Sequence, residues 1–334
     1  MIKTTIIIPC LNEKKYIATC IESILSSEID FESCEIILVD GGSSDATVEI
    51  IQKYQEKYGF IKLLHNPKKI TPISMNIAIK EAKGDYIIRL DAHAKYPKDY
   101  IKKLLYYHQQ LNASNVGGVW ITDVKNKNKK SNAIKKVLSH PFGVGNGAFR
   151  IGVMKIQEVD TVPFGCYKKE LLLKLGLYDE RLIRNQDIEL NKRIKKNGGK
   201  IYLVPDITCT YYARENFIDL AKNNFANGKW NILTAYYTKK INSLSLRHFV
   251  PLIFVLMLLL PALLSLFYSS FIYIFLFMLI SYLSLVIIIS LKLKKKSNGF
   301  AYLLGSFFTL HFSYGLGSLS GIFSIIIKYI KGDR

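Results

Sequence analysis

The stretch IILVDGGSSD at residues 36–45 decides the fold class of this chain. Its four aliphatic residues are typical of a strand that is buried on both faces, and a polar cluster follows them directly. Comparable aliphatic runs stand at residues 5–8, 61–64 and 86–90. Patterns with helical periodicity lie between these runs. Strands that alternate with helices in this way predict an α/β fold with a mainly parallel sheet and helices on both faces.

Polar side chains follow three of the predicted strands at the point where each strand ends. Asn12-Glu13 follows the first strand, Asp40 to Asp45 follows the second, and Asp91-Ala92-His93 follows the fourth. In a parallel sheet, ligands bind beyond the carboxyl ends of the strands. We therefore expect these three clusters to form one binding site.

Two phosphate-binding signatures are missing from the chain. Neither G-x-G-x-x-G nor G-x-x-x-x-G-K-[ST] occurs, which disfavours dinucleotide oxidoreductases and P-loop NTPases. Carboxylates at strand ends instead suggest a sugar nucleotide held through side chains and a divalent cation, because Asp oxygens are common ligands of such ions. Transfer to a hydroxyl also needs a base. Asp91 with His93 is the candidate metal site, and Asp187 or Glu189 is the candidate base.

Two apolar stretches near the C-terminus predict attachment to a membrane. Residues 249–291 are 43 consecutive residues without Asp, Glu, Lys, Arg or His, and residues 301–327 are interrupted only by His311. Runs of this length suit a bilayer rather than a soluble core. The net charge is +20, and residues 216–334 hold 12 Lys and Arg against two acids. Because this basic excess flanks apolar spans, we expect membrane lipids as partners and no nucleic acid.

The first apolar stretch is too long for one span and fits two, broken near Ser269-Ser270. Basic residues flank it at Arg247-His248 and from Lys292 to Lys296, so the positive-inside rule predicts a multi-pass protein of the cell membrane with a cytoplasmic catalytic domain. The second stretch either spans or lies as a re-entrant or interfacial segment. We expect a catalytic domain over residues 1–215, an interfacial connector over 216–248 and a membrane region with two or three transmembrane helices over 249–334.

Several smaller patterns also carry expectations. The five cysteines are odd in number and show no C-x-x-C spacing, which suits a reducing compartment and argues against a zinc knuckle. Gly317 and Gly321 form a G-x-x-x-G pattern that can pack two helices together. The Lys/Asn-rich residues 125–130 predict a solvated surface loop, and the glycine-rich residues 141–152 predict a mobile loop.

Four motifs in order resemble those of the inverting glycosyltransferases of family 2, which have the GT-A fold. They are IIIPCLNE at residues 6–13, ILVDGGSSD at 37–45, the segment from Asn76 to Asp91, and NQDIEL at 185–190. Together they cover roughly residues 4–215 and are specific in combination. The variant DAHAKYP at residues 91–97 and the apolar C-terminal region are most similar to the membrane-bound succinoglycan-type exopolysaccharide glucosyltransferases.

The resemblance implies a role for each matching residue. Asp40 would bond the base, usually uracil, and Asp45 would support its loop. Asp91 would reach the diphosphate and its metal ion, Mn²⁺ or Mg²⁺, and Asp187 would be the general base for inversion. The other residues implied to lie at the nucleotide are Pro9, Asn12, Glu13 and Asn76.

Three positions depart from the family pattern. His93 stands where a second acid is usual, so the metal would be held more weakly or by imidazole, which suits Mn²⁺ better than Mg²⁺. Gly41 replaces a common second Asp, and Gln186 replaces a Glu. The Q-x-x-R-W signature of processive synthases is also missing, and Gly228-Lys229-Trp230 is only weakly similar to it. The missing signature favours the addition of a single sugar.

These observations predict a membrane-anchored glycosyltransferase. The expected reaction moves a hexose, first of all glucose, from a nucleotide sugar to a lipid-linked or growing surface polysaccharide acceptor, and the expected donor nucleotide is UDP. One alternative is a polyprenyl-phosphate glycosyltransferase, whose acceptor is the bare lipid phosphate. Another is a catalytically silent, nucleotide-binding membrane scaffold, which intact Asp91 and Asp187 argue against.

Overall fold

The computed structural model describes residues 1–239 and 244–332. The chain divides into two compact units, one made of residues 1–121 and 148–212 and the other of residues 122–147 and 213–334. Each unit is described by itself. The domain boundary expected at residue 215 stays a prediction.

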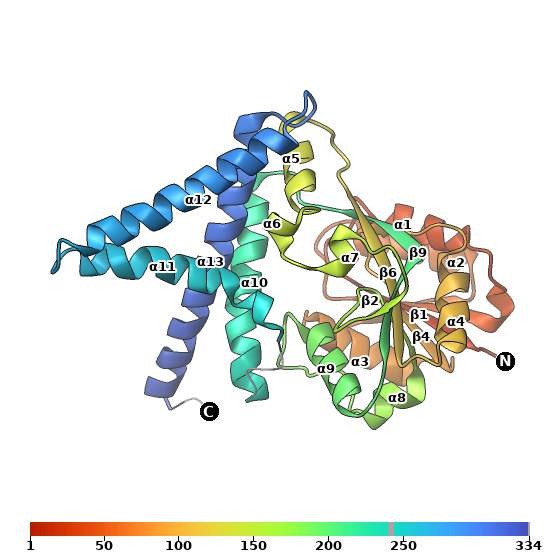
Figure 1. The fold of residues 1–334 in the computed structure, drawn as a ribbon. Coiled ribbons are helices and arrows are strands. Elements are labelled where there is room, and N and C mark those ends of the chain that lie inside the picture. Colours follow the sequence, from red (N-terminus) through yellow and green to blue (C-terminus); the bar gives the residue numbers. More distant parts are fainter. Residues whose placement is uncertain (240–243, 333–334) are drawn as a thin grey trace. The chain divides into compact units, whose positions relative to one another are not determined.

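Four parallel strands form one half of the sheet in the first unit (Figure 1). Their order is β3-β2-β1-β4, and β1 lies between β2 and β4 with Ile6 opposite both Ile36 and Ile88. The strands are β1 (Thr4–Cys10), β2 (Cys34–Asp40), β3 (Ile61–His65) and β4 (Tyr86–Arg89). All four predicted strands are confirmed.

Both faces of this half-sheet are buried, which explains the unbroken aliphatic runs. Ile6 and Leu38 belong to the core on one face, whereas Ile7 and Val39 belong to the core on the other. The helices that connect the parallel strands are α1 (Ile17–Leu25), α2 (Thr47–Lys57) and α3 (Thr71–Glu81). This arrangement aligns the carboxyl ends of β1, β2 and β4 at one edge, as predicted.

The other half of the sheet is antiparallel, and the sequence indicated only one of its strands, at residues 116–120. It continues the order β4-β8-β6-β9-β5, and β7 pairs with β9. Its strands are β5 (Ala94–Lys95), β6 (Asn115–Asp123), β7 (Gln157–Glu158), β8 (Cys166–Lys168) and β9 (Ile201–Tyr212). The helices of this half are α4 (Tyr100–Gln110), α8 (Lys169–Lys174) and α9 (Gln186–Lys196).

Residues 125–152 contain more helix than the sequence predicts. They form α5 (Lys129–Val137), α6 (Pro141–Val144) and α7 (Ala148–Ile151). Asn128 caps α5 by accepting a hydrogen bond from the Ser131 amide at 3.0 Å. Although α5 is rich in lysine, it has a narrow apolar face on which Ala133 and Val137 are fully buried. The expectation of a loop therefore fails from residue 129 onward.

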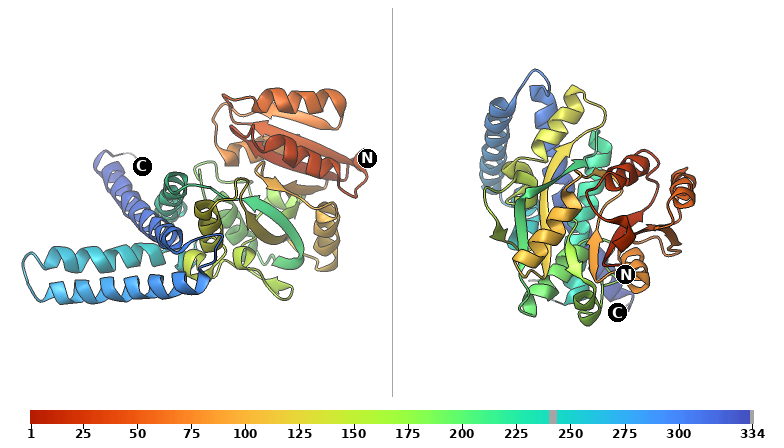
Figure 2. Two further views of the ribbon diagram at one scale, coloured as in Figure 1. Left: turned by 90° about the horizontal axis from the view of Figure 1, so that it is seen from above. Right: turned by 90° about the vertical axis from the view of Figure 1, so that its right-hand side faces the viewer.

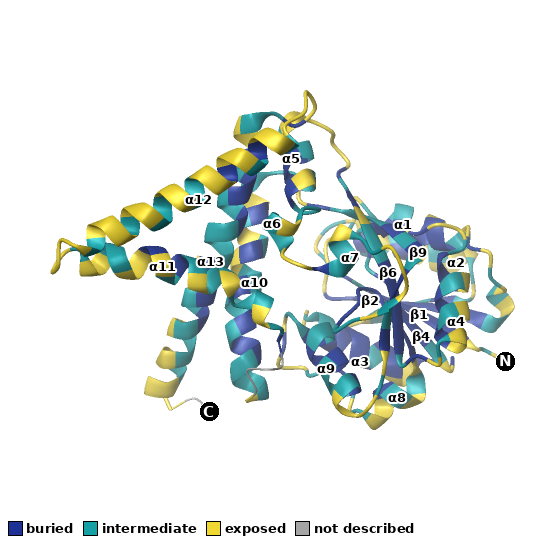
Figure 3. Ribbon diagram, in the orientation of Figure 1, coloured by how far each residue is buried: buried dark blue, intermediate teal, exposed yellow. Residues whose placement is uncertain are grey.

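Helices make up most of the second unit. They are α10 (Phe217–Thr238), α11 (Val250–Leu264), α12 (Phe271–Leu293) and α13 (Phe300–Ile330). Two of them, α12 and α13, are long and apolar enough to cross a membrane, whereas α11 has 15 residues. The chain turns between α11 and α12 at Ser269-Ser270, as expected, so that the two form a hairpin (Figure 2). Exposed residues dominate the surface of this hairpin (Figure 3).

Candidate active site

The loops after β1 and β2 are joined by hydrogen bonds at the carboxyl edge of the sheet. The Asn12 amide donates to Ser43 Oγ at 2.8 Å, and Asn12 Oδ1 accepts from the Ser44 amide at 2.8 Å. Asn12 adopts a left-handed conformation with φ of 57°, which Asn tolerates better than most residues. The Glu13 amide donates to Thr47 Oγ1 at 2.8 Å. The structure thus brings two of the predicted clusters together.

Asp40 shapes the loop on which the nucleotide is predicted to lie. Its carboxylate is buried and accepts hydrogen bonds from the Gly42 amide at 2.8 Å and from Ser43 Oγ at 2.5 Å. Gly42 has φ of +82°, a conformation that strains any residue with a Cβ. Pro9 lies in β1 and pairs with Val39, the residue before Asp40 in β2. Asp40 therefore holds the loop in a single shape.

Asp45 acts at the start of α2. Its carboxylate accepts hydrogen bonds from the amide and the hydroxyl of Thr47 and from the Lys14 amide. Desolvation raises the pKa of this carboxyl, but the hydrogen bonds from Thr47 and Lys14 together lower it by more, so the net pKa lies below its usual value. Asp45 therefore stands one residue before the N-cap of α2, Ala46, and its bonds tie the start of α2 to the loop after β1.

Asp91 follows β4, and a buried tyrosine fixes its backbone. The Asp91 amide donates to Tyr96 Oη at 2.8 Å, and Tyr96 Oη donates in turn to the Asp91 carbonyl at 3.0 Å. The carboxylate points to the guanidinium of Arg89, with Nη2 and Oδ1 separated by 3.3 Å. The side chain of Asp91 remains 20% exposed, which leaves it accessible to a ligand.

Arg89 joins the two acids to which the sequence assigned separate roles. Its Nη1 atom lies 3.5 Å from Asp187 Oδ2, while its Nη2 atom faces Asp91. The Arg89 side chain is only 10% exposed. Burial lowers the pKa of this guanidinium, but the two carboxylates raise it more, and the net pKa lies above its usual value. Arg89 was missed from the sequence, although a charged residue inside an otherwise buried strand is a recognisable signal.

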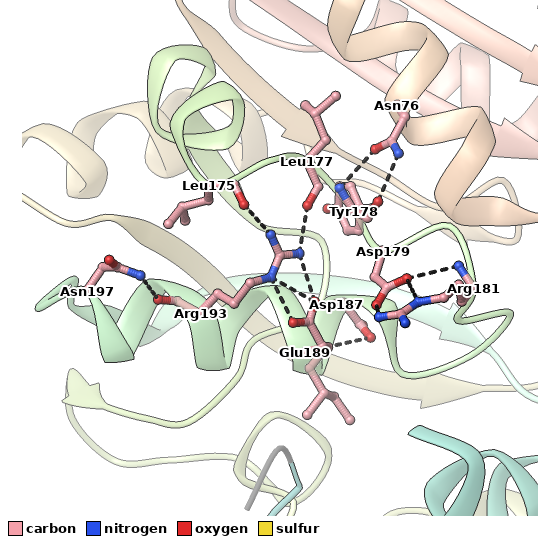
Figure 4. A network of polar contacts seen from close by, with 11 residues as sticks. Asn76, Leu175, Leu177, Tyr178, Asp179, Arg181, Asp187, Glu189, Arg193 and Asn197 are labelled. Carbon is pink, nitrogen blue, oxygen red and sulfur yellow. Dashed lines mark hydrogen bonds and ion pairs between the residues drawn. The ribbon is translucent and has the colours of Figure 1, made fainter. Parts of the chain in front are cut away.

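Asp187 and Glu189 lie on the first turn of α9 but have different surroundings (Figure 4). Glu189 is buried and accepts two hydrogen bonds from Arg193, at 2.8 Å from Nε and 2.7 Å from Nη2. Arg193 also donates to the carbonyls of Leu175 and Leu177, so this pair holds the preceding loop to α9. Asp187 instead has a side chain that is 30% exposed. The geometry therefore favours Asp187 over Glu189 as the base.

Asn76 anchors the segment that leads to α9. Its Nδ2 atom donates to the Tyr178 carbonyl at 2.9 Å and to Glu180 at 3.1 Å, and its Oδ1 atom accepts from the Tyr178 amide at 2.9 Å (Figure 4). These bonds occupy both ends of the amide within the protein. Among the described residues, the hydrogen bonds of the Asn76 side chain go to Tyr178 and Glu180, and its contact with the nucleotide stays a prediction.

His93 pairs with Glu13 rather than with Asp91. Its Nδ1 atom lies 3.2 Å from Glu13 Oε1. Burial lowers the pKa of His93, but Tyr211 and Glu13 raise it, and the net pKa is about 9. The contact with Glu13 occupies the Nδ1 atom of the ring. In the described part of the chain no three His, Cys, Asp or Glu side chains form a group that could hold a metal ion. The metal site of Asp91 with His93 stays a prediction.

An aromatic stack lies next to His93 and was also missed. The rings of Trp120 and Tyr211 are parallel with centroids 4.2 Å apart, and the Arg150 guanidinium lies 4.6 Å from the Trp120 centroid. The edge of His93 meets Tyr211 at 5.1 Å. These residues come from β6, β9 and α7, elements whose contacts no local sequence pattern reveals.

Comparison with known proteins agrees with this arrangement. Residues 5–166 match the family described as Glycosyl transferase family 2. The chain is 31% identical over 234 residues to the dolichyl N-acetyl-alpha-D-glucosaminyl phosphate 3-beta-D-2,3-diacetamido-2,3-dideoxy-beta-D-glucuronosyltransferase of Methanococcus voltae, covering 67% of this chain and 71% of that protein. It is 30% identical over 226 residues to the succinoglycan biosynthesis protein ExoA of Rhizobium meliloti, covering 67% of each.

Solved structures show the same fold at lower identity. The mannosyltransferase PcManGT from Pyrobaculum calidifontis, in complex with GDP-Man and Mn²⁺, aligns with a TM-score of 0.61 and 14% identity over 96% of this chain and 87% of that one. TarS from S. aureus aligns with a TM-score of 0.52 and 15% identity, covering 97% of this chain and 92% of that one. The chain therefore belongs to glycosyl transferase family 2 and is a nucleotide-sugar glycosyltransferase with the GT-A fold.

Proposed function

We propose that this enzyme transfers a hexose, first of all glucose, from a UDP-sugar to a lipid-linked saccharide or a growing surface polysaccharide, with inversion at the anomeric carbon. The observation that carries the proposal is the placement of Asp91 and Asp187 on opposite ends of one guanidinium. One acid is thereby available to the diphosphate and the other to the acceptor.

The described residues support a division of labour. The loops held by Asn12 and Asp40 form a fixed edge against which the nucleotide can lie. Asp187 accepts the proton of the acceptor hydroxyl as that oxygen bonds to the anomeric carbon. In an inverting reaction the hydroxyl attacks from the side opposite the leaving diphosphate. Asp91 follows β4 and Asp187 lies in α9, so separate elements supply the residues for the two sides.

A divalent cation, Mn²⁺ or Mg²⁺, belongs to the proposal with Asp91 as its protein ligand. When bound, such an ion neutralises the charge that develops on the diphosphate. Phosphate oxygens of the donor would complete its shell, because His93 is hydrogen-bonded to Glu13. His93 remains the second predicted ligand, and it would have to give up its contact with Glu13 to bind the ion through Nδ1.

The names of the relatives support a lipid-linked or polysaccharide acceptor. The M. voltae protein is named for a dolichyl phosphate sugar, and the R. meliloti protein for succinoglycan biosynthesis. The aromatic side chains of Trp120 and Tyr211 are of the kind that contacts sugar rings, although each already packs against the other. A polyprenyl phosphate acceptor remains the second candidate, since Arg150 beside this stack offers a cation to a phosphate.

We also propose that the α11–α12 hairpin anchors the enzyme in the cell membrane with the catalytic unit in the cytoplasm. The hairpin is apolar throughout, and basic residues stand at both of its open ends, Arg247-His248 and Lys292 to Lys296. The positive-inside rule places such ends in the cytoplasm.

Transfer by isolated membranes tests the proposal. Membranes from cells that produce the full chain are incubated with a panel of radiolabelled UDP- and GDP-sugars, and the lipid fraction is extracted and counted. We expect one UDP-hexose to label the lipid or polysaccharide fraction and Asp187→Asn membranes to stay unlabelled. Labelling by the wild type from GDP-sugars alone would overturn the UDP assignment, and equal labelling by Asp187→Asn would overturn the role of the base.

A further inference from the structure

Helix α13 passes the length and hydropathy test for a transmembrane span. In the second unit it packs against the apolar helices α11 and α12, but also against two polar helices, α5 and α10. Over its first half, Leu303 and Phe307 pack against Ala133 and Val137 of α5 in one buried cluster. The remaining surface of α5 carries basic side chains: Lys129, Lys130, Lys135 and Lys136.

The second half of α13 runs alongside α10. Gly317 packs on the backbone of Phe225, and a Cβ at Gly321 would lie 2.7 Å from the Lys229 carbonyl. These glycines confirm the expected G-x-x-x-G packing face. Further along, Lys328 Nζ donates to Tyr237 Oη at 2.6 Å. The partner helix α10 contains Asn, Asp and Lys along its length: Asp219, Lys222, Asn223, Asn224, Asn227, Lys229 and Asn231.

Charged residues also lie beside the midpoint of α13, which falls at Gly315. Asn231 Nδ2 donates both to Tyr314 Oη at 2.6 Å and to the His248 carbonyl at 3.1 Å. The turn Leu246–His248, which carries Arg247, is thereby tied to the middle of the helix. If α13 crossed a bilayer from end to end, this basic turn would sit close to the centre of the hydrocarbon, where ionisable groups are costly.

We propose that α13 does not cross the membrane but lies in its plane at the level of the lipid headgroups, together with α10. The inference rests on the membrane attachment proposed above, and it assigns the crossing to the α11–α12 hairpin alone. The expected partner of the α10–α13 pair is an anionic lipid surface, because the pair and the adjoining turn carry basic residues with few acids. These basic residues are Lys222, Lys229, Arg247, Lys328 and Lys331.

The burial of α12 contrasts with that of α13. Within the most apolar 18 residues of each helix, 6% are buried on α12 and 28% on α13. Residues spaced by seven on α12 are exposed to the surroundings: Tyr273 is 74%, Ile280 59% and Ile287 42% exposed. This helix has the lipid-facing surface of a true span, whereas α13 is covered by polar helices on one side along its length.

Helix α13 also offers three exposed residues on one face at the same spacing, which permits a matched measurement of depth. Leu316 is 45%, Phe323 62% and Ile330 77% exposed. From the first to the third the helix rises about 21 Å, most of the thickness of a hydrocarbon core. A spanning helix must carry these three positions through very different depths, and an in-plane helix holds them at similar depths.

The test uses the full chain reconstituted in vesicles of phosphatidylcholine and phosphatidylglycerol. Single cysteines are introduced at positions 316, 323 and 330 and, as the matched set, at positions 273, 280 and 287. The native cysteines are all buried and should contribute little labelling. Each variant receives a nitroxide spin label, and collision with oxygen and with a water-soluble nickel complex gives its depth.

We expect the α12 set to be deepest at position 280 and the α13 set to stay uniformly shallow, within about 10 Å of the headgroups. A depth maximum at position 323 like that at 280 would overturn the in-plane assignment. Shallow values in both sets would instead refute the hairpin as the anchor, while leaving α13 at the surface. Release of the protein from vesicles by carbonate would remove membrane attachment and the inference with it.

Accessibility of the C-terminal end gives a second reading that does not depend on depth. Tyr329 is 87% exposed, and Ser269 at the hairpin tip and Lys296 between α12 and α13 are exposed as well. A membrane-impermeant maleimide applied to intact cells should label Ser269→Cys and leave Tyr329→Cys and Lys296→Cys unlabelled until the cells are opened. Labelling of Tyr329→Cys from outside would show that α13 crosses.

Discussion

Removal of the Arg89 guanidinium should destabilise the catalytic unit by leaving two carboxylates without their shared cation. Arg89→Met keeps most of the side-chain volume and deletes the charge. At the observed separations of 3.3 and 3.5 Å, each ion pair corresponds to about 5 kcal/mol of Coulomb energy at an effective dielectric constant of 20. Desolvation offsets much of this, and breaking a buried pair from one side typically costs about 3–5 kcal/mol.

The lower end of that range applies here, because Asp91 is 20% and Asp187 30% exposed to solvent. We expect a loss of about 3 kcal/mol, which corresponds to a fall in Tm of about 6–12 °C for a unit of this size. Thermal unfolding of the detergent-solubilised full chain measures it. Lys62→Met is the matched control, since it also removes the cation beside a buried acid, Glu35, and only there.

A double variant tests the cause of the loss. Asp187→Asn removes one of the uncompensated charges, so in the Arg89→Met background it should restore part of the lost Tm, whereas alone it should lower Tm. Additive losses in the double variant would refute the reasoning, because they would show that Arg89 and Asp187 do not interact. Transfer activity should fall at least a hundredfold in Arg89→Met and recover in part in Arg89→Lys.

Three further outcomes follow from the site and its core. Asp187→Asn should keep nucleotide-sugar binding and lose transfer by about 10²–10⁴-fold, at least tenfold more than Glu189→Gln in initial-rate assays; the reverse order would make Glu189 the base. Burial, and then Lys168, lower the pKa of His108 to about 4. Below about pH 6.5 this side chain therefore takes up a proton when the protein unfolds, so the free energy of unfolding should be highest above pH 6.5 and fall by about 3 kcal/mol toward pH 4. A free energy of unfolding in urea that does not change over this pH range would contradict the prediction. Gly42→Ala should cost about 1 kcal/mol or more because φ is +82° and should raise KM for the nucleotide sugar, as measured by chemical unfolding and donor titration.

The parallel half of the sheet could be predicted because each of its strands is local in sequence and apolar on both faces. The antiparallel half could not. Strand β9 mixes buried Ile207 and Cys209 with half-buried polar neighbours, and its partners come from distant parts of the chain. Helix α5 was missed for a similar reason, since its four lysines equal in number the residues that it buries and give the segment a polar composition.

The site was predictable to the extent that its residues follow strands. Asn12, Asp40 and Asp91 were expected at one edge, and the structure places them at the carboxyl ends of β1, β2 and β4. The partners of these residues were not predictable. Arg89 contacts Asp187 only because α9 packs near β4, and the bond between His93 and Glu13 joins residues 80 positions apart. Tertiary contacts of this kind leave no local pattern.

The course of the chain between the two units bears on how the catalytic part can be isolated. The segment 122–147 leaves the first unit in mid-chain and folds with the membrane helices, where Ala133 and Val137 pack against α13. A protein shortened at residue 215 would therefore retain α5 but lose the residues of α12 and α13 that pack against its apolar side. Such a fragment should aggregate and be degraded quickly, unless α5 is replaced by a polar linker or its buried residues are replaced by charged ones. A single cut cannot free this enzyme from its anchor.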